Sequence, residues 1–255
     1  MDFISTRTSQ FDYFSQVLGN PAWRHRKVLD FGGNRGGFLS EAGHSVDHED
    51  YWCLDIGRAA LAEGRKQFPK AHFLHYDRYN SEYNPGGCRN QPVPDSGLQF
   101  DFILAFSVFT HIHQREMLEL IAQLRGLLAP SGVLAFTFTD PGYYTGLSSL
   151  PRGFYLRKLL KMLQLQFPSL DIDAVFQRAR DCDWSILIDD TLHVEPDDGL
   201  CQQERQGRPL ESYCAFYSVD YMAALFPEGD IQPPVGQEWQ HCCILNRSSR
   251  IVEGA

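Results

Sequence analysis

Residues 28–38 read VLDFGGNRGGF, and this stretch decides the fold. It begins as a short apolar strand, reaches Asp30, passes through a glycine-dense turn and resumes an apolar helical pattern at Phe38. In an open α/β sheet, the first strand–turn–helix of this kind binds a nucleotide-like ligand, because glycines let the main chain approach closely. The N–H groups at the start of the following helix can face an anionic part of that ligand. The alternative is a tight turn that only joins a strand to a helix.

Two residues of this stretch distinguish between possible ligands. The dinucleotide fingerprint G-x-G-x-x-G, started at Gly32, requires a glycine at position 34, where this chain has Asn34. Asparagine tolerates a left-handed backbone better than most residues, so the turn is expected to survive this change. Asp30 places a carboxylate at the strand end, where it would face a cation rather than a pyrophosphate. S-adenosylmethionine is such a ligand, because it carries an ammonium and a sulfonium on an adenosine.

The stretch resembles motif I of the class I methyltransferases, D-x-G-x-G-x-G, in which Asp30, Gly32 and Gly36 match and Asn34 departs. The resemblance covers most of the chain, because FDFILAFSVFTHI and the later LLAPSGVL are similar to motifs IV to VI of bacterial small-molecule methyltransferases. In that family the end of the fourth strand borders the reactive methyl group. That position falls on Phe106 and Ser107 in this sequence.

Composition restricts the class of protein. The 255 residues suffice for one large domain, or one domain with a cap. A net charge of -9 argues against a nucleic-acid surface, which needs clustered Lys and Arg. The N-terminus does not read as a signal peptide, no apolar run approaches the length of a membrane span, and seven scattered cysteines fit reduced thiols. We therefore expect a cytoplasmic protein with a small-molecule substrate and no nucleic-acid or membrane partner; its oligomeric state is left open.

Strand and helix patterns alternate through residue 140, which predicts parallel βαβ winding. With the resemblance, the expected fold is α/β: a Rossmann-like, doubly wound, seven-stranded and mostly parallel sheet with an antiparallel last strand and a helical cap insertion. We expect a polar loop at 195–208 within the cap. The expected divisions are a helical lead-in (1–27), an S-adenosylmethionine-binding core (28–140), a cap and substrate insertion (141–212) and C-terminal strands that complete the sheet (213–255).

Acids at the ends of later strands extend the predicted cofactor site. Asp55 ends the second strand, 19 residues beyond Gly36, close to the spacing at which such an acid meets a ribose diol. The alternative for Asp55 is a strand-end cap. Asp77 follows the third strand, where the resemblance places the adenine-side acid. The predicted cofactor-binding residues are Asp30, Gly32, Gly33, Asn34, Gly36, Asp55, Ile56, Asp77, Arg78, Phe106 and Ser107.

Three histidines are the catalytic candidates. Methyl transfer to oxygen or nitrogen is an in-line displacement that positioning accelerates, and a nearby histidine can take the proton. His111 and His113 directly follow the fourth strand, so one of them could face the methyl group. The alternative for His111 is that it caps the next helix or packs beneath it. His241, in the last strand, is the third candidate.

No required metal is expected. His241 is followed by Cys242 and Cys243, but neighbouring strand residues point to opposite faces, so the three cannot bind one ion. Metal-assisted transfer would need clustered acids at the ends of the fourth and fifth strands, where only Asp140 stands. Tyr143 and the adjacent Tyr144 could line an aromatic substrate pocket or could be packing residues.

The resulting hypothesis is an S-adenosylmethionine-dependent methyltransferase that methylates a small molecule at an oxygen atom. Secondary metabolites belong to the candidate acceptors. Three alternatives remain open at this stage. An N-methyltransferase would have the same fold, and so would a non-catalytic S-adenosylmethionine-binding protein, because fold does not fix function. An NAD(P)-dependent oxidoreductase is disfavoured by Asp30 and Asn34.

Overall fold

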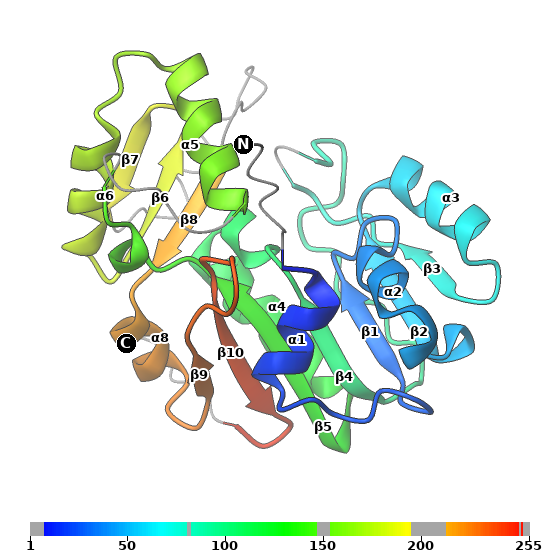
Figure 1. Cartoon of the computed structure of the whole chain (residues 1–255). Helices are drawn as coiled ribbons and strands as arrows, with labels where there is room; N and C mark the ends of the chain where they lie inside the picture. Colours follow the sequence, from blue (N-terminus) through cyan, green and yellow to red (C-terminus); the bar gives the residue numbers. More distant parts are fainter. Residues whose placement is uncertain (1–7, 81–82, 147–153, 195–212, 250, 252–255) are drawn as a thin grey trace, which may run out of the picture.

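The protein is built around a central seven-stranded sheet (Figure 1), seen in a computed structural model that describes residues 8–80, 83–146, 154–194, 213–249 and 251. The strand order is β3-β2-β1-β4-β5-β10-β9. Strands β1 to β5 pair in parallel, and β10 is antiparallel to both β5 and β9. The expected Rossmann-like sheet with an antiparallel last strand is confirmed. Its strands are β1 (Val28–Phe31), β2 (Tyr51–Asp55), β3 (His72–His75), β4 (Phe100–Ala105), β5 (Leu128–Phe138), β9 (Asp230–Gln232) and β10 (His241–Asn246).

Helices cover both faces of this sheet (Figure 1). Alternation along the strands divides the core: Val28 of β1 belongs to the cluster under α1, α2 and α3, whereas Leu29 belongs to the cluster under α4 and α8. Buried apolar positions at helical spacing attach each helix to its face. The bounds are α1 (Gln10–Val17), α2 (Gly37–Ala42), α3 (Arg58–Gln67), α4 (Gln114–Gly126) and α8 (Val219–Leu225), with 3₁₀ turns η1 (Gly43–Ser45), η2 (His48–Asp50), η3 (Phe109–His111) and η4 (Pro141–Tyr143).

The cap is a small α+β layer beside the carboxyl ends of the central strands. Helices α5 (Phe154–Gln166) and α6 (Ile172–Arg180) pack on one face of a three-stranded antiparallel sheet in the order β7-β6-β8. The other face of that sheet joins the core under α4 and α8. Its strands are β6 (Trp184–Ile188), β7 (Thr191–Val194) and β8 (Tyr213–Tyr217).

The position of β8 corrects one expectation. We expected residues 213–255 to complete the central sheet, but β8 pairs with β6 along its whole length and so belongs to the cap. The central sheet is completed only by β9 and β10. The physical reason is that an apolar strand pattern predicts a strand without specifying its partner. The expected polar loop at 195–208 lies outside the described residues.

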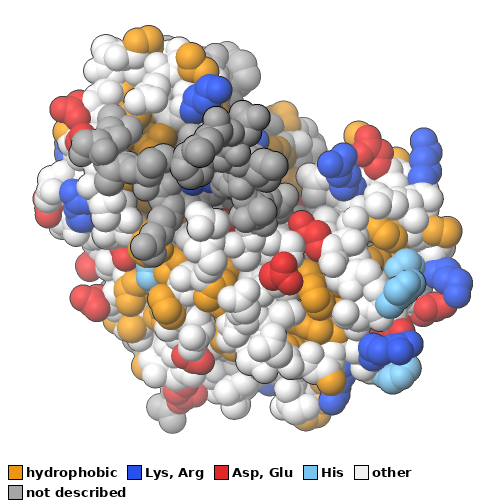
Figure 2. Space-filling model, viewed as in Figure 1, with side chains coloured by type: hydrophobic (Ala, Val, Ile, Leu, Met, Phe, Trp, Pro, Cys, Tyr) orange, Lys and Arg blue, Asp and Glu red, His pale blue; other side chains and the backbone are white. Residues whose placement is uncertain are grey.

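The described surface and helices bear on which partners the protein could have. On the face shown in Figure 2, Lys and Arg side chains are dispersed and are not gathered into a continuous patch over the described residues. Within the described ranges, every helix is too short or too polar to cross a bilayer.

The cores of the two layers give a stability prediction. Leu124 of α4 is completely buried, so Leu124→Ala is expected to lower the free energy of unfolding by about 2–5 kcal/mol. Leu165 of α5 is 71% exposed, so the same substitution there is expected to change stability by less than about 0.5 kcal/mol. Denaturant unfolding of both variants checks this. Similar losses in the two variants would contradict the assigned core.

Candidate functional site

The glycine turn lies at the carboxyl end of β1, and its shape requires its glycines. Gly32 has a φ of +75° and donates its N–H to the carbonyl of Leu54 at 2.8 Å. A Cβ at Gly32 would collide with the Val108 side chain, and one at Gly33 would collide with the Asp30 carboxylate. Asn34 has a φ of +55°, so the residue that departs from the motif does adopt the left-handed backbone expected of it.

Asp55 joins this turn to the end of β2. Its Oδ2 accepts the N–H of Asn34 at 2.8 Å, and its Oδ1 accepts the N–H of Gly57 at 2.6 Å. Burial raises the pKa of Asp55, and these two backbone donors act in the opposite direction. Each carboxylate oxygen retains a second lone pair. Asp55 therefore fixes the turn while it can still accept hydrogen bonds from a ligand.

Asp30 has a different position from the one predicted for it. Asp30 is 3% exposed, and its carboxylate lies behind Gly33 and accepts a hydrogen bond from the Tyr51 hydroxyl at 2.6 Å. Burial raises the pKa of Asp30 to about 7, and the Tyr51 hydrogen bond acts against this effect. The expectation that Asp30 faces a cationic ligand is therefore corrected, because strand alternation and the turn place its side chain beneath the main chain.

A cavity of about 720 Å³ opens at the carboxyl ends of β1, β2, β4 and β5. Ligand sites of small molecules commonly have this size. The cavity extends from the glycine turn past the end of β4 to α5 and β8 of the cap. The structure brings together on its walls these residues that the sequence predicted: Gly32, Gly33, Asn34, Asp55, Ile56, Arg78, Phe106, Ser107 and His111.

Two other predicted cofactor residues lie away from the cavity wall. Gly36 is the left-handed residue before α2, with a φ of +83°, and it faces the Phe73 and Phe68 rings. The Asp77 side chain is 53% exposed and lies 3.9 Å from Arg58. The chain after β3 turns so that Asp77 faces outward and its neighbour Arg78 faces inward. The adenine-side role of Asp77 stays a prediction, and the structure places Arg78 rather than Asp77 on the cavity wall.

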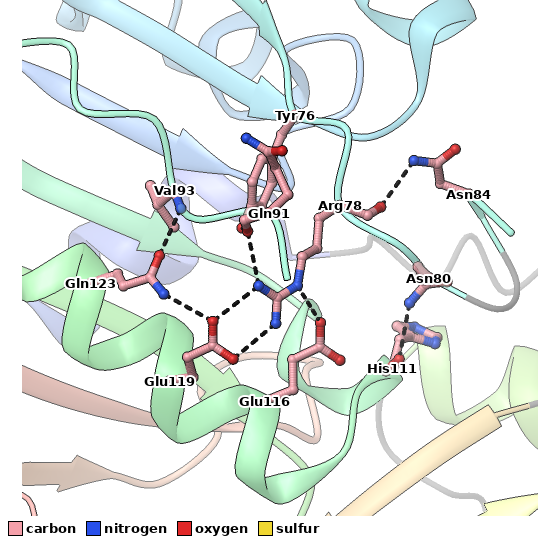
Figure 3. A network of polar contacts seen from close by, with 10 residues as sticks. All are labelled: Tyr76, Arg78, Asn80, Asn84, Gln91, Val93, His111, Glu116, Glu119 and Gln123. Atoms are coloured by element: carbon pink, nitrogen blue, oxygen red, sulfur yellow. Dashed lines mark hydrogen bonds and ion pairs between the residues drawn. The ribbon is translucent and has the colours of Figure 1, made fainter. Parts of the chain in front are cut away.

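Arg78 is held in an ionic network (Figure 3). Its Nε donates to Glu116 at 2.9 Å, and its two Nη atoms donate to the two carboxylate oxygens of Glu119 at 3.0 Å each. Burial alone would lower the pKa of Arg78. The hydrogen bonds to Glu119 and Glu116 and the charge of Glu116 raise the pKa by more than burial lowers it, so it lies well above the ordinary value. Because Glu116 and Glu119 lie on α4, Arg78 attaches the segment after β3 to that helix.

A second polar network lies at the end of β4. Ser107 has a φ of +57°, an uncommon conformation for serine, and its N–H donates to the Thr137 hydroxyl at 2.7 Å. The Thr137 hydroxyl donates to Oε1 of Gln240 at 2.5 Å, and Nε2 of Gln240 donates back to the Ser107 hydroxyl at 3.1 Å. This closed ring holds Ser107 and Gln240 on the cavity wall. Backbone strain supported in this way is typical of functional sites.

The three histidines have three different environments. His111 ends η3 and lines the cavity, and its carbonyl accepts the Asn80 side-chain N–H at 3.2 Å. His113 is the N-cap of α4: its Nδ1 accepts the Arg115 N–H at 3.2 Å. His241 stacks on Phe138 across the β5–β10 pair, and burial lowers its pKa. Of the three, His111 lines the cavity; His113 and His241 lie outside its lining, and their catalytic roles stay predictions.

Potential metal ligands lie elsewhere. Within the described residues, His25, Asp47 and Asp50 form a cluster near the surface that is separate from the cavity. Cys242 and Cys243 belong to the core clusters on opposite faces of the sheet, as strand geometry requires. Cys242 and Cys243 therefore cannot bind the same ion.

Several cavity residues were not predicted from the sequence. Gln240 precedes β10, Thr139 follows β5, and Lys158 lies on α5, so all three come from elements far apart in the chain. The aromatic pair proposed for a substrate pocket lies outside the cavity: Tyr143 packs against His241, and Tyr144 stacks on Phe176 in the cap core. No local motif marks these positions, because only tertiary packing brings them together.

The buried carboxylate under the turn gives a pH prediction. Asp30 has a pKa of about 7 in the folded protein against 3.8 as its ordinary value, so the folded state binds more protons between these pH values. Stability therefore falls as pH rises from about 5 to 8 by on the order of 2 kcal/mol from this group. Asp30→Asn, which keeps an acceptor for Tyr51, is expected to flatten the fall, whereas the exposed Asp77→Asn retains it. Denaturant unfolding at several pH values checks this, and parallel curves for Asp30→Asn and the unmodified protein would contradict it.

Comparison with known sequences identifies a domain that includes the glycine turn and most of the central strands beside the cavity. Residues 29–134 match the family model described as methyltransferase domain. Over 127 residues the chain is 29% identical to the non-reducing polyketide synthase mapC of Penicillium roqueforti (strain FM164). The match covers 47% of this chain and only 5% of the length of that curated relative.

Comparison with solved structures covers almost the whole chain. The glycopeptide N-methyltransferase MtfA, complexed with S-adenosyl-L-methionine, matches with a TM-score of 0.52 and 10% identity over 95% of each chain. An S-adenosylmethionine-dependent methyltransferase from Clostridium acetobutylicum matches with a TM-score of 0.52 and 10% identity, over 96% of this chain and 92% of the other. At such low identity these likenesses show the fold. Residues 29–134 are therefore a methyltransferase domain, and the fold of the chain is that of the class I S-adenosylmethionine-dependent methyltransferases.

Proposed function

We propose that this methyltransferase domain transfers a methyl group from S-adenosylmethionine to an oxygen atom of a small molecule. The observation that carries the proposal is one cavity that continues from the glycine turn, past Ser107, to the cap. A cofactor at the turn and an acceptor under the cap would then meet at the end of β4. The cavity volume of about 720 Å³ suits two small molecules better than a macromolecular acceptor.

The described residues fit this cofactor. Gly32 and Gly33 present main chain without side chains to the cavity, which permits the close approach of an adenosine. Asp55 offers carboxylate lone pairs to a ribose diol. Glu41 adds negative charge to the same wall, which favours a ligand that carries an ammonium and a sulfonium.

The protein would contribute position and proton transfer. S-adenosylmethionine supplies an electrophilic methyl group when it is bound. The ring of Ser107, Thr137 and Gln240 fixes the wall past which the two ligands meet, so the acceptor oxygen can be held in line with the methyl group. His111, on the same cavity, would accept the proton of the acceptor hydroxyl. An oxygen acceptor is proposed because its O–H must lose a proton as the new bond forms.

Other functions predict different results. MtfA is an N-methyltransferase, so an amine acceptor in this fold is the first alternative. A non-catalytic S-adenosylmethionine-binding protein would bind the cofactor without turnover, and an NAD(P)-dependent oxidoreductase would bind a nicotinamide cofactor. The cytoplasmic location and the lack of a nucleic-acid partner stay predictions from the sequence.

The cofactor assignment predicts a difference between two aspartates. Asp55→Ala is expected to weaken binding of S-adenosylhomocysteine by about tenfold or more, because a charged acceptor of hydrogen bonds is lost. Asp77→Ala removes an exposed carboxylate outside the cavity and is expected to leave the affinity unchanged. Calorimetric titration measures both. Equal effects of the two variants, or binding of NADH in place of S-adenosylhomocysteine, would contradict the assignment.

The two histidines after β4 predict separable defects. His111→Ala is expected to lower kcat by about a hundredfold while the Kd of S-adenosylhomocysteine stays unchanged, because proton transfer alone is lost. His113→Ala is expected to lower the free energy of unfolding by about 1 kcal/mol, because the cap of α4 is lost, with little change in kcat. Acceptor screening by mass spectrometry followed by single-turnover kinetics measures the first effect. An unchanged kcat in His111→Ala would remove this residue from the mechanism.

A further inference from the structure

The end of the cavity under the cap differs in chemistry from the end at the glycine turn. Helix α5 contributes Leu159 and Met162 to its wall, and β8 contributes Cys214. Trp239, just before β10, adds a large aromatic side chain. Apolar and aromatic walls bind the apolar body of a ligand, and a flat ring packs well against an indole.

Among the residues that the structure describes, three Lys or Arg side chains line the cavity, and they differ in their partners. Arg35 lies 3.6 Å from Glu63. Arg78 is paired with Glu116 and Glu119. Lys158 of α5 has no carboxylate partner within the described part of the chain. It is exposed, and its ammonium, on a flexible stem, can follow an anionic group at this end of the cavity.

Two buried polar atoms at this end of the cavity also lack partners among the described residues. Trp239 is 3% exposed, and its indole N–H has no acceptor there. Thr139, which follows β5, is fully buried, and its hydroxyl has no partner there either. Both residues line the cavity. Buried polar groups in native proteins are almost always hydrogen-bonded, so oxygen atoms of a bound molecule would complete these sites.

We infer that the acceptor is a hydroxylated aromatic carboxylic acid, bound with its ring against Trp239 and its carboxylate toward Lys158. This inference rests on the proposed function and specifies its substrate class. In the transfer, the acceptor O–H bond and the S–CH₃ bond of the cofactor break and an O–CH₃ bond forms. The proton goes to His111, and the cofactor leaves as the neutral thioether. The carboxylate takes no part in bond making and serves for recognition.

The test compares acids with their neutral amides on protein saturated with S-adenosylhomocysteine. The probes are 4-hydroxycinnamate and 3-hydroxybenzoate, each titrated beside its amide by calorimetry. The unmodified protein is expected to bind each acid about fivefold more tightly than its amide, the size of one partly exposed ion pair. Lys158→Met is expected to abolish this preference. Lys161→Met, on the same helix but outside the cavity, is expected to retain it.

A second variant tests the indole. Trp239→Phe keeps an aromatic ring and removes the N–H, so it is expected to weaken binding of acid and amide alike by about fivefold, with the acid-to-amide ratio unchanged. An unchanged affinity of both probes in Trp239→Phe would overturn the placement of the ring.

The remaining outcomes separate the two proposals. Equal binding of acid and amide, binding of neither pair, or the same loss in Lys161→Met as in Lys158→Met would overturn the inferred acceptor class. If S-adenosylhomocysteine binds in those experiments, the proposed function stands and only the acceptor class fails. If S-adenosylhomocysteine does not bind at all, the proposed function itself fails.

Discussion

The rest of the structure depends on the main chain at Gly32–Asn34 being held between two carboxylates. Asp30 lies behind Gly33 so closely that no side chain fits there, and Asp55 holds the N–H of Asn34 from the cavity side. The end of β1 is thereby attached to the end of β2, and the turn becomes bare main chain on the cavity wall. A short stretch of backbone without side chains is what a nucleoside needs for close approach. The central constraint is therefore steric: the turn has no room for a side chain at Gly33, and Asp30 and Asp55 hold its main chain in place.

Polar networks then fix the walls on both sides of this turn. Arg78 joins the segment after β3 to α4 through two carboxylates, and the backbone carbonyl of Gln91 accepts a further N–H from Arg78 at 2.8 Å. The ring of Ser107 with Thr137 and Gln240 joins β4, β5 and the start of β10. Buried polar networks of this kind specify one arrangement, because a group left without its partner is costly. The cap, in contrast, reaches the cavity through the apolar side of α5.

The sequence predicted most of what is local and little of what depends on packing between distant elements. The alternation of strands and helices, the left-handed Asn34 and the acid at the end of β2 all follow from patterns within a few residues. The strand at 213–217 was recognised as a strand but assigned to the wrong sheet, because periodicity does not encode a partner. β5 starts at Leu128 and continues through Pro130 and Gly132, with an irregular register against β4.

The same limit applies to the site. Asp30 is one of the last two residues of β1 and Asp77 follows β3, both near strand ends as ligand-binding acids are, yet one lies beneath the turn and the other faces outward. Whether a strand-end side chain enters a cavity depends on one or two backbone angles that no residue type specifies. His111 and His113 are two residues apart, but η3 ends at His111 and α4 begins directly after His113, so the first is a cavity residue and the second a helix cap.

A crystal structure of the protein with S-adenosylhomocysteine tests the central claim most directly. The account predicts that the ribose diol lies within hydrogen-bond distance of the Asp55 carboxylate, that the adenosine covers Gly32 and Gly33, and that the sulfur faces Ser107 toward the cap. A ligand bound elsewhere, or in this cavity with its ribose away from Asp55, would contradict it.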